Sequence, residues 1–121
     1  MDDAVSWVMD FAVKPGQLVM LTPLVEEMAR SARAEPGARQ FAWFVSEDGT
    51  SGQVHERYAD TTAALAHLHT FTERFAERVL AAVEPTRFTV LGLPSVGVRQ
   101  ALDGFAPTYL RPLGDFTRDT V

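Results

Sequence analysis

Hydrophobic and polar residues alternate along several short segments of the chain. Residues 5–13 place Val, Trp, Met, Phe and Val at every second position, and residues 39–46 and 53–58 alternate in the same way. A period of two with β-branched and aromatic members is typical of a strand with one buried face. We therefore predict strands over these three segments, and a fourth over the largely apolar residues 87–93.

Two other segments repeat their apolar residues at helical spacing. The first covers residues 17–34 and contains Pro23, which cannot donate a backbone hydrogen bond. Either this helix is kinked, which we expect, or its regular part starts at Pro23 with Thr22 as N-cap. The second helix follows Asp60, a good N-cap residue. Its predicted buried stripe consists of Ala64, Leu68, Phe71, Phe75, Val79 and Val83.

The order strand–helix–strand–strand–helix–strand predicts an α+β protein with a ferredoxin-like fold. In this fold an antiparallel four-stranded sheet carries both helices on one face. The first strand also has apolar residues on its other side, Val8 and Ala12. We therefore expect a second subunit to cover the free sheet face, giving a homodimer through the sheet faces. Residues 1–93 form the predicted domain.

Residues 94–121 exceed this basic unit and are predicted to form a C-terminal helix and arm. Ser95 can cap a short helix that ends at Asp103-Gly104. The rest is rich in Pro, aromatic residues and Leu, unlike a solvated tail. We expect an ordered arm that packs on its own domain or on a partner subunit, with residues 119–121 frayed.

Composition narrows the possible functions. The chain has 121 residues, a net charge of -5, scattered basic residues and no Cys. It lacks the basic stripe typical of proteins that bind nucleic acid or anionic membranes, so we expect neither partner. The absence of Cys excludes disulfides, thiolate catalysis and Cys-based metal sites. With no secretion signal at Met1-Asp2-Asp3 and no apolar run near about 18 residues, we expect a cytoplasmic protein.

Several short motifs together form a recognisable pattern. Lys14-Pro15-Gly16 precedes the first helix and Glu35-Pro36-Gly37 follows it. The run Glu56-x-Tyr58-x-Asp60 comes next, and Ala63, Ala64, His67 and Phe71 complete the pattern. Over residues 5–93 the chain resembles the antibiotic biosynthesis monooxygenase family.

The resemblance implies a dimeric α+β barrel and, by analogy with members of the family, a monooxygenase that needs no cofactor. Such members oxidise quinols and polycyclic phenols, whose deprotonated form itself reduces dioxygen in a mostly apolar cavity between sheet and helices. Haem-degrading relatives use an Asn-Trp-His set. This chain has no Asn, which argues against haem chemistry.

The predicted catalytic residues are His67, Glu56 and Tyr58. His67 lies at the edge of the helical stripe, where it is either a general base for a phenolic proton or a structural histidine. Glu56 shares a strand face with Tyr58 and needs a partner if that face is buried, and His67 is a plausible one. The pair either manages a proton or braces the strand–helix corner, or Glu56 pairs with an Arg instead. Tyr58 either donates to a substrate oxygen or fills the core.

The predicted substrate pocket for a small aromatic ligand consists of Trp43, Phe11, Leu68 and Phe71. The alternative for these aromatic residues, and for Trp7 and Phe44, is core or dimer packing. Trp43 and Phe44 are adjacent in a strand and must serve different faces.

The three histidines do not have the spacing of a metal site. His55 faces away from Glu56, and His69 lies on the other side of the helix stripe from His67. We predict no metal. Two further functions remain open: a non-catalytic ligand-binding or accessory protein of the same dimeric fold, and an isomerase- or cyclase-like enzyme with the same proton handling but no oxygen.

Overall fold

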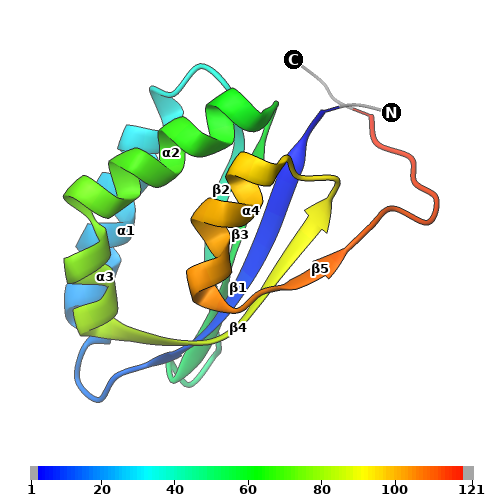
Figure 1. The fold of residues 1–121 in the computed structure, drawn as a ribbon. Helices are drawn as coiled ribbons and strands as arrows, with labels where there is room; N and C mark the ends of the chain where they lie inside the picture. Colours follow the sequence, from blue (N-terminus) through cyan, green and yellow to red (C-terminus); the bar gives the residue numbers. More distant parts are fainter. Residues whose placement is uncertain (1–2, 119–121) are drawn as a thin grey trace.

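The computed structural model describes residues 3–118 and contains one sheet with helices on one of its faces (Figure 1). The sheet has five strands in the order β2-β3-β1-β4-β5. Neighbouring strands are antiparallel except β4 and β5, which are parallel. The strands are β1 (Val5–Val13), β2 (Ala38–Val45), β3 (Ser51–Tyr58), β4 (Val83–Gly92) and β5 (Thr108–Leu110). The predicted ferredoxin-like α+β fold is confirmed, and β5 extends the predicted four-stranded sheet by one short parallel strand.

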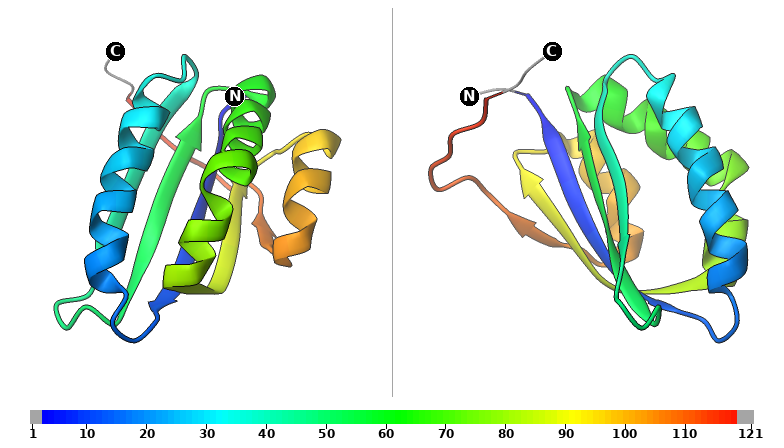
Figure 2. Two further views of the ribbon diagram at one scale, coloured as in Figure 1. Left: turned by 90° about the vertical axis from the view of Figure 1, so that its left-hand side faces the viewer. Right: turned by 180° about the vertical axis from the view of Figure 1, so that it is seen from behind.

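The helices form one layer that covers a single face of the sheet (Figure 2). They are α1 (Leu18–Arg33), α2 (Thr61–Arg74), α3 (Ala76–Ala82) and α4 (Val96–Leu102), followed by a 3₁₀ turn, η1 (Asp103–Phe105). No helix among residues 3–118 is long and apolar enough to cross a lipid bilayer.

Helix α1 begins at Leu18, so a start at Pro23 is wrong. Pro23 lies inside the helix, and the Thr22 hydroxyl donates to the Leu18 carbonyl at 3.1 Å. Pro23 cannot donate to the carbonyl four residues earlier, on Val19, which is 79% exposed. Water can hydrate that carbonyl, which lowers the cost of the missing bond.

The predicted second helix is in fact two helices separated at Phe75. Its backbone has φ -125° and ψ -27°, outside the helical range. Val83, predicted as the last residue of the helical stripe, is the first residue of β4, which therefore starts four residues before the predicted strand. Val83 lies four residues after Val79 and both are buried. Spacing alone could not distinguish another helical turn from a buried strand residue.

Alternate residues of β1 and β3 fill the core between sheet and helices. Trp7, Val54 and Tyr58 are buried, and the Trp7 and Tyr58 rings lie 5.0 Å apart. The opposite sheet face carries Phe44, which is 56% exposed and contacts His55 edge-on at 5.1 Å. Trp43 and Phe44 therefore lie on different faces, as their adjacent positions require.

The C-terminal extension first packs on its own domain as α4, and beyond β5 it crosses the sheet face opposite the helices. The Ser95 hydroxyl caps α4 by accepting from the Val98 amide at 3.3 Å, and Val98 and Leu102 are fully buried. Beyond β5 the arm exposes Leu113 (98%) and Phe116 (76%). The expected fraying of residues 119–121 lies outside the described residues.

Candidate functional site

His67 lies between two carboxylates that come from different parts of the fold. Its Nε2 atom is 3.0 Å from Oε1 of Glu56 on β3. Its Nδ1 atom is 3.1 Å from both carboxylate oxygens of Glu35, in the loop between α1 and β2. The predicted contact between Glu56 and His67 is confirmed. The contact with Glu35 was not predicted.

The position of His67 follows from the start of α2 and from the strand beneath it. Asp60 caps α2 by accepting a hydrogen bond from the Ala63 amide at 2.8 Å, which fixes where the helix begins. His67 then faces the sheet and is only 7% exposed. The sequence placed His67 at the edge of the buried stripe, but Leu68, placed inside it, is only half-buried. His67, rather than Leu68, is therefore the more buried of the two side chains. The orientation of α2 on the sheet decides this, and helical spacing does not define that orientation.

Glu35 reaches His67 because the loop that carries it packs tightly against α2. Gly37 accepts a hydrogen bond from the Ala59 amide at 2.9 Å. A side chain at Gly37 would collide with the Cβ atom of Ala63. The glycine of the Glu35-Pro36-Gly37 motif thus permits close approach. This motif is the sequence signal that could have pointed to Glu35, but it was interpreted only as the end of the helix and as part of the family pattern.

Tyr58 contacts the same carboxylate oxygen of Glu56 as His67 does. Its hydroxyl donates to Glu56 Oε1 at 2.6 Å, and its ring lies 4.8 Å from the His67 ring. Burial and the neighbouring Glu56 carboxylate raise the pKa of Tyr58 far above its ordinary value, so the hydroxyl remains a donor. Tyr58 is fully buried and does not line the cavity described below. This geometry does not support the expected contact with substrate. It makes Tyr58 a positioning residue for Glu56.

The protonation of His67 is decided by competing effects. Burial disfavours the charged imidazolium, but the Glu56 hydrogen bond and the negative charges of Glu56 and Glu35 outweigh it. The net effect raises the pKa of His67 above its ordinary value. With an acceptor at each ring nitrogen, His67 is best satisfied as a doubly protonated imidazolium.

An apolar cavity of about 270 Å³ opens beside this cluster, between the sheet and the helices. It is lined by Trp7, Met9, Phe41, Trp43, Val54, Glu56, His67, Leu68, Phe71, Thr72, Ala76, Val79, Leu80, Pro85, Phe88 and Phe105. Its volume is close to the lower end of the roughly 300–1,000 Å³ typical of small-molecule sites. The ionisable groups on its wall are Glu56 and His67, so polar chemistry in the cavity is concentrated at one point.

Three of the four predicted pocket residues line the cavity: Trp43, Leu68 and Phe71. Phe11 does not. Its ring packs 5.2 Å from that of Trp43 and lines a neighbouring groove beside α1. The indole Nε1 of Trp43 is buried and has no hydrogen-bond partner in the described part of the chain.

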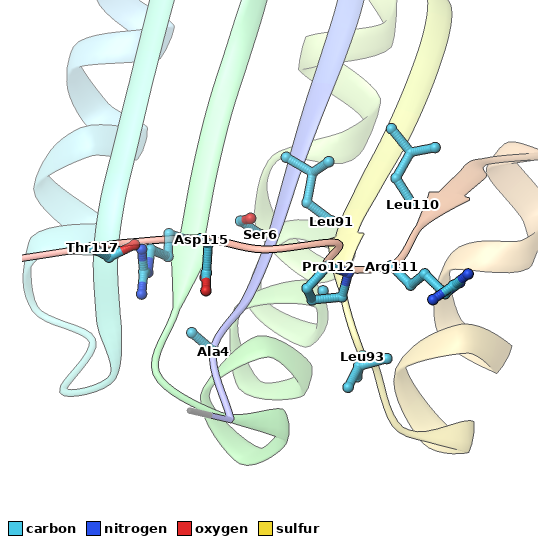
Figure 3. A pocket seen from close by; sticks show the side chains of 11 residues that line it. Ala4, Ser6, Leu91, Leu93, Leu110, Arg111, Pro112, Asp115 and Thr117 are labelled. Carbon is cyan, nitrogen blue, oxygen red and sulfur yellow. The ribbon is translucent and has the colours of Figure 1, made fainter. Parts of the chain in front are cut away.

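A second hollow of about 300 Å³ lies on the other side of the sheet, beneath the C-terminal arm (Figure 3). Figure 3 shows Leu91, Leu110 and Pro112 around it, with Asp115 on the crossing arm. It contains no histidine. The paired acid and imidazole therefore distinguish the sheet–helix cavity from this one.

The other two histidines lie away from the cluster. His55 Nε2 is 2.9 Å from the Gln53 side chain on the open sheet face, and His69 Nε2 is 3.3 Å from Glu73 on the surface of α2. Among residues 3–118, no group of three or more His, Asp or Glu side chains is arranged to hold a metal ion.

The chain matches a known protein family over most of its length. Residues 4–84 match the antibiotic biosynthesis monooxygenase family model, so the chain belongs to this family. No curated protein sequence matches the chain significantly.

Several solved structures share the fold. MupZ from Pseudomonas fluorescens aligns over 98% of this chain and 91% of its own, with a TM-score of 0.87 and 20% identity. Rv0793 from Mycobacterium tuberculosis aligns over 76% and 96%, with a TM-score of 0.65 and 26% identity. SnoaB from Streptomyces nogalater, described as a cofactor-independent oxygenase, aligns over 78% and 96%, with a TM-score of 0.64 and 18% identity. The alignment with MupZ includes the C-terminal extension.

Proposed function

We propose that this protein is a cofactor-independent monooxygenase that oxidises a small aromatic phenol or quinol with dioxygen. The observation that carries the proposal is the Glu56 carboxylate at the wall of an apolar cavity, with Oε1 held by both Tyr58 and His67. Membership of the monooxygenase family and the shared fold of SnoaB support it. A fold alone does not define a reaction, so the assignment rests on the site.

In this mechanism Glu56, rather than His67, accepts the phenolic proton. Tyr58 and His67, the two partners of Glu56 in the described part of the chain, both contact Oε1. In this mechanism Oε2 therefore receives the proton. His67 already carries protons toward its two carboxylates and so is a poor base. Its positive charge stabilises the phenolate that forms beside it in the cavity. We therefore assign the role of general base to Glu56 instead of His67, and His67 stabilises the negative charge of the phenolate.

The phenolate then supplies the electrons. An unsubstituted ring carbon conjugated with the phenolate oxygen forms a bond to dioxygen, the O–O bond breaks, and that carbon loses its hydrogen to become a carbonyl. One oxygen atom enters the quinone product and the other leaves as water, so one phenol and one dioxygen give one quinone and one water. The apolar walls exclude bulk water from the phenolate during this step.

Oxygen uptake with a panel of one-ring hydroquinones and two-ring naphthols tests this proposal. We expect turnover by the wild type and a loss of about 100-fold or more in Glu56→Gln, a typical cost of removing a general base. His67→Ala should also lose turnover, whereas His69→Ala, a matched change on the exposed side of α2, should not. Oxygen uptake no faster than in buffer, or unchanged in Glu56→Gln, would refute the mechanism.

The complete pairing of His67 favours a second candidate function, a non-catalytic binding or accessory protein. A histidine with a carboxylate at each nitrogen is also the arrangement of a structural brace between α1, α2 and β3. This alternative predicts that the cavity binds an aromatic phenol, observed by calorimetry, without oxygen uptake.

We further propose that two copies pair through the open sheet faces. The exposed Phe44, together with the half-buried Val8, supports this arrangement, since pairing would remove apolar surface from water. Sedimentation equilibrium should give a dimer mass, and Phe44→Glu should shift it toward the monomer. A wild-type monomer at all concentrations would refute the pairing.

A further inference from the structure

The C-terminal extension contributes a wall to the sheet–helix cavity. Phe105, in η1, lines the cavity and stacks on Phe88 of β4, with ring centroids 5.2 Å apart and planes 16° apart. The Phe88 ring in turn lies 6.2 Å from that of Trp7 in the core. Both Phe88 and Phe105 lie beyond residues 4–84, which match the family model. The extension therefore adds to the cavity a side chain that the matched region does not supply.

Phe105 lies where the cavity opens to solvent. Lining residues deep in the core, such as Trp7 and Val54, are at most 2% exposed, whereas Phe105 is 39% exposed. Leu80 of α3 also lines the cavity and is 43% exposed. Figure 1 shows α4 and the turn after it beside the β4 edge, across from α3. Phe105 and Leu80 thus flank the opening from two different elements.

A cluster of polar contacts fixes the turn that carries Phe105. The Tyr109 hydroxyl donates to Asp103 Oδ1 at 2.7 Å, and the Arg99 guanidinium lies 3.8 Å from the Tyr109 ring centroid. Ala106, directly after Phe105, has a left-handed backbone with φ 51°, a conformation that costs free energy in a residue other than glycine. Its amide donates to the Asp103 carbonyl at 3.0 Å. The turn is therefore held in one conformation by several independent contacts.

We propose that Phe105 is a specificity-determining residue that limits the cavity to aromatic ligands of one or two rings. This inference rests on the proposed function only in taking the ligand to be an aromatic phenol. A flat ligand beside Glu56 would extend toward the opening, where the Phe105 ring stacks on Phe88 and Leu80 lines the cavity from α3. A larger fused system would require the Phe105 ring to move, and the Arg99, Asp103 and Tyr109 contacts oppose that movement.

Ligand binding tests this inference without requiring turnover. The probes are 1-naphthol, with two rings, and 1-hydroxypyrene, with four, each titrated while the fluorescence of the cavity residues Trp7 and Trp43 is followed. We expect the wild type to bind 1-naphthol more tightly. Phe105→Ala should change the ratio of the two dissociation constants by about tenfold in favour of 1-hydroxypyrene, because one apolar pocket contact typically discriminates by about 10- to 200-fold. Phe116→Ala, a matched change in the exposed arm, should leave the ratio unchanged.

A second variant keeps the Phe105 ring and loosens the turn. Tyr109→Phe removes only the hydroxyl that donates to Asp103, and it should shift the ratio in the same direction by a smaller factor. A ratio unchanged within twofold in a folded Phe105→Ala protein would overturn the inference, as would failure of the wild type to bind either probe. Failure of the proposed monooxygenase function would instead appear as binding without oxygen uptake, so the two outcomes are distinguishable.

Discussion

The Nδ1 atom of His67 lies 3.1 Å from both carboxylate oxygens of Glu35, which joins the loop after α1 to the middle of α2. Glu56 occupies the other ring nitrogen at 3.0 Å. Two carboxylates thus contact the same imidazole ring, and His67 is only 7% exposed. Such an arrangement stabilises the imidazolium, and in the proposed mechanism Glu56 is then the group that accepts the proton of the ligand.

The raised pKa of His67 predicts a specific dependence of stability on pH. The folded-state pKa lies above the ordinary value of 6.5. The protonated histidine therefore contributes stability that is fully present below pH 6.5 and is lost as the pH rises through the folded-state pKa. We expect the free energy of unfolding, measured with urea between about pH 6 and pH 9, to fall with pH in the wild type.

His67→Gln should remove most of this slope, whereas His69→Gln should retain it, because His69 is an exposed histidine on the same helix. Identical slopes in the wild type and His67→Gln would contradict the assignment of His67 as a buried imidazolium.

Glu35→Gln tests the contribution of the second carboxylate. The change removes a negative charge beside Nδ1 but keeps the side-chain shape, so the pKa of His67 should fall and stability near neutral pH should decrease by about 1.5–3 kcal/mol, the range of a charged hydrogen bond. A titration of the His67 ring by ¹H–¹⁵N NMR measures the pKa directly. Glu73→Gln, which alters the exposed partner of His69, should leave the His67 titration unchanged. A His67 pKa unaffected by Glu35→Gln would show that Glu35 does not stabilise the charge.

Gly37→Ala should move the loop that carries Glu35 away from α2. The new methyl group would collide with the Cβ atom of Ala63, and such overpacking typically costs about 1–3 kcal/mol. We expect a lower urea midpoint together with a lower His67 pKa. Gly114→Ala is the control, since a Cβ atom there meets nothing within 4 Å. Stability equal to that of the wild type in Gly37→Ala would contradict the close packing of loop and helix.

Much of the fold follows from local patterns in the sequence. The alternation in residues 5–13 and 53–58 determines which side chains face the helices, because a strand turns every second residue to the same side. That rule placed Glu56 and Tyr58 on the same strand face, which the structure turns toward the helices, and Asp60 marked the start of α2. The contact between Glu56 and His67 was predictable because both residues flank one strand–helix corner.

Other features depend on contacts between distant parts of the chain. Glu35 is 32 residues from His67 and lies in a loop, so no periodicity connects them. The depth of Tyr58 and the displacement of Phe11 from the cavity are set by the packing of α1 and α2 on the sheet. The break at Phe75 and the parallel strand β5 likewise depend on tertiary packing, which overrides local propensity.

The central claim is that Glu56 removes the proton of a phenolic ligand bound in the cavity. Absorbance spectroscopy under anaerobic conditions tests it directly, since without dioxygen the ionised ligand cannot be consumed. At neutral pH free 1-naphthol is un-ionised. The proposed mechanism predicts a naphtholate spectrum when 1-naphthol binds the wild type, and a naphthol spectrum when it binds Glu56→Gln. Bound but un-ionised naphthol in the wild type, or the same naphtholate spectrum in both proteins, would contradict it.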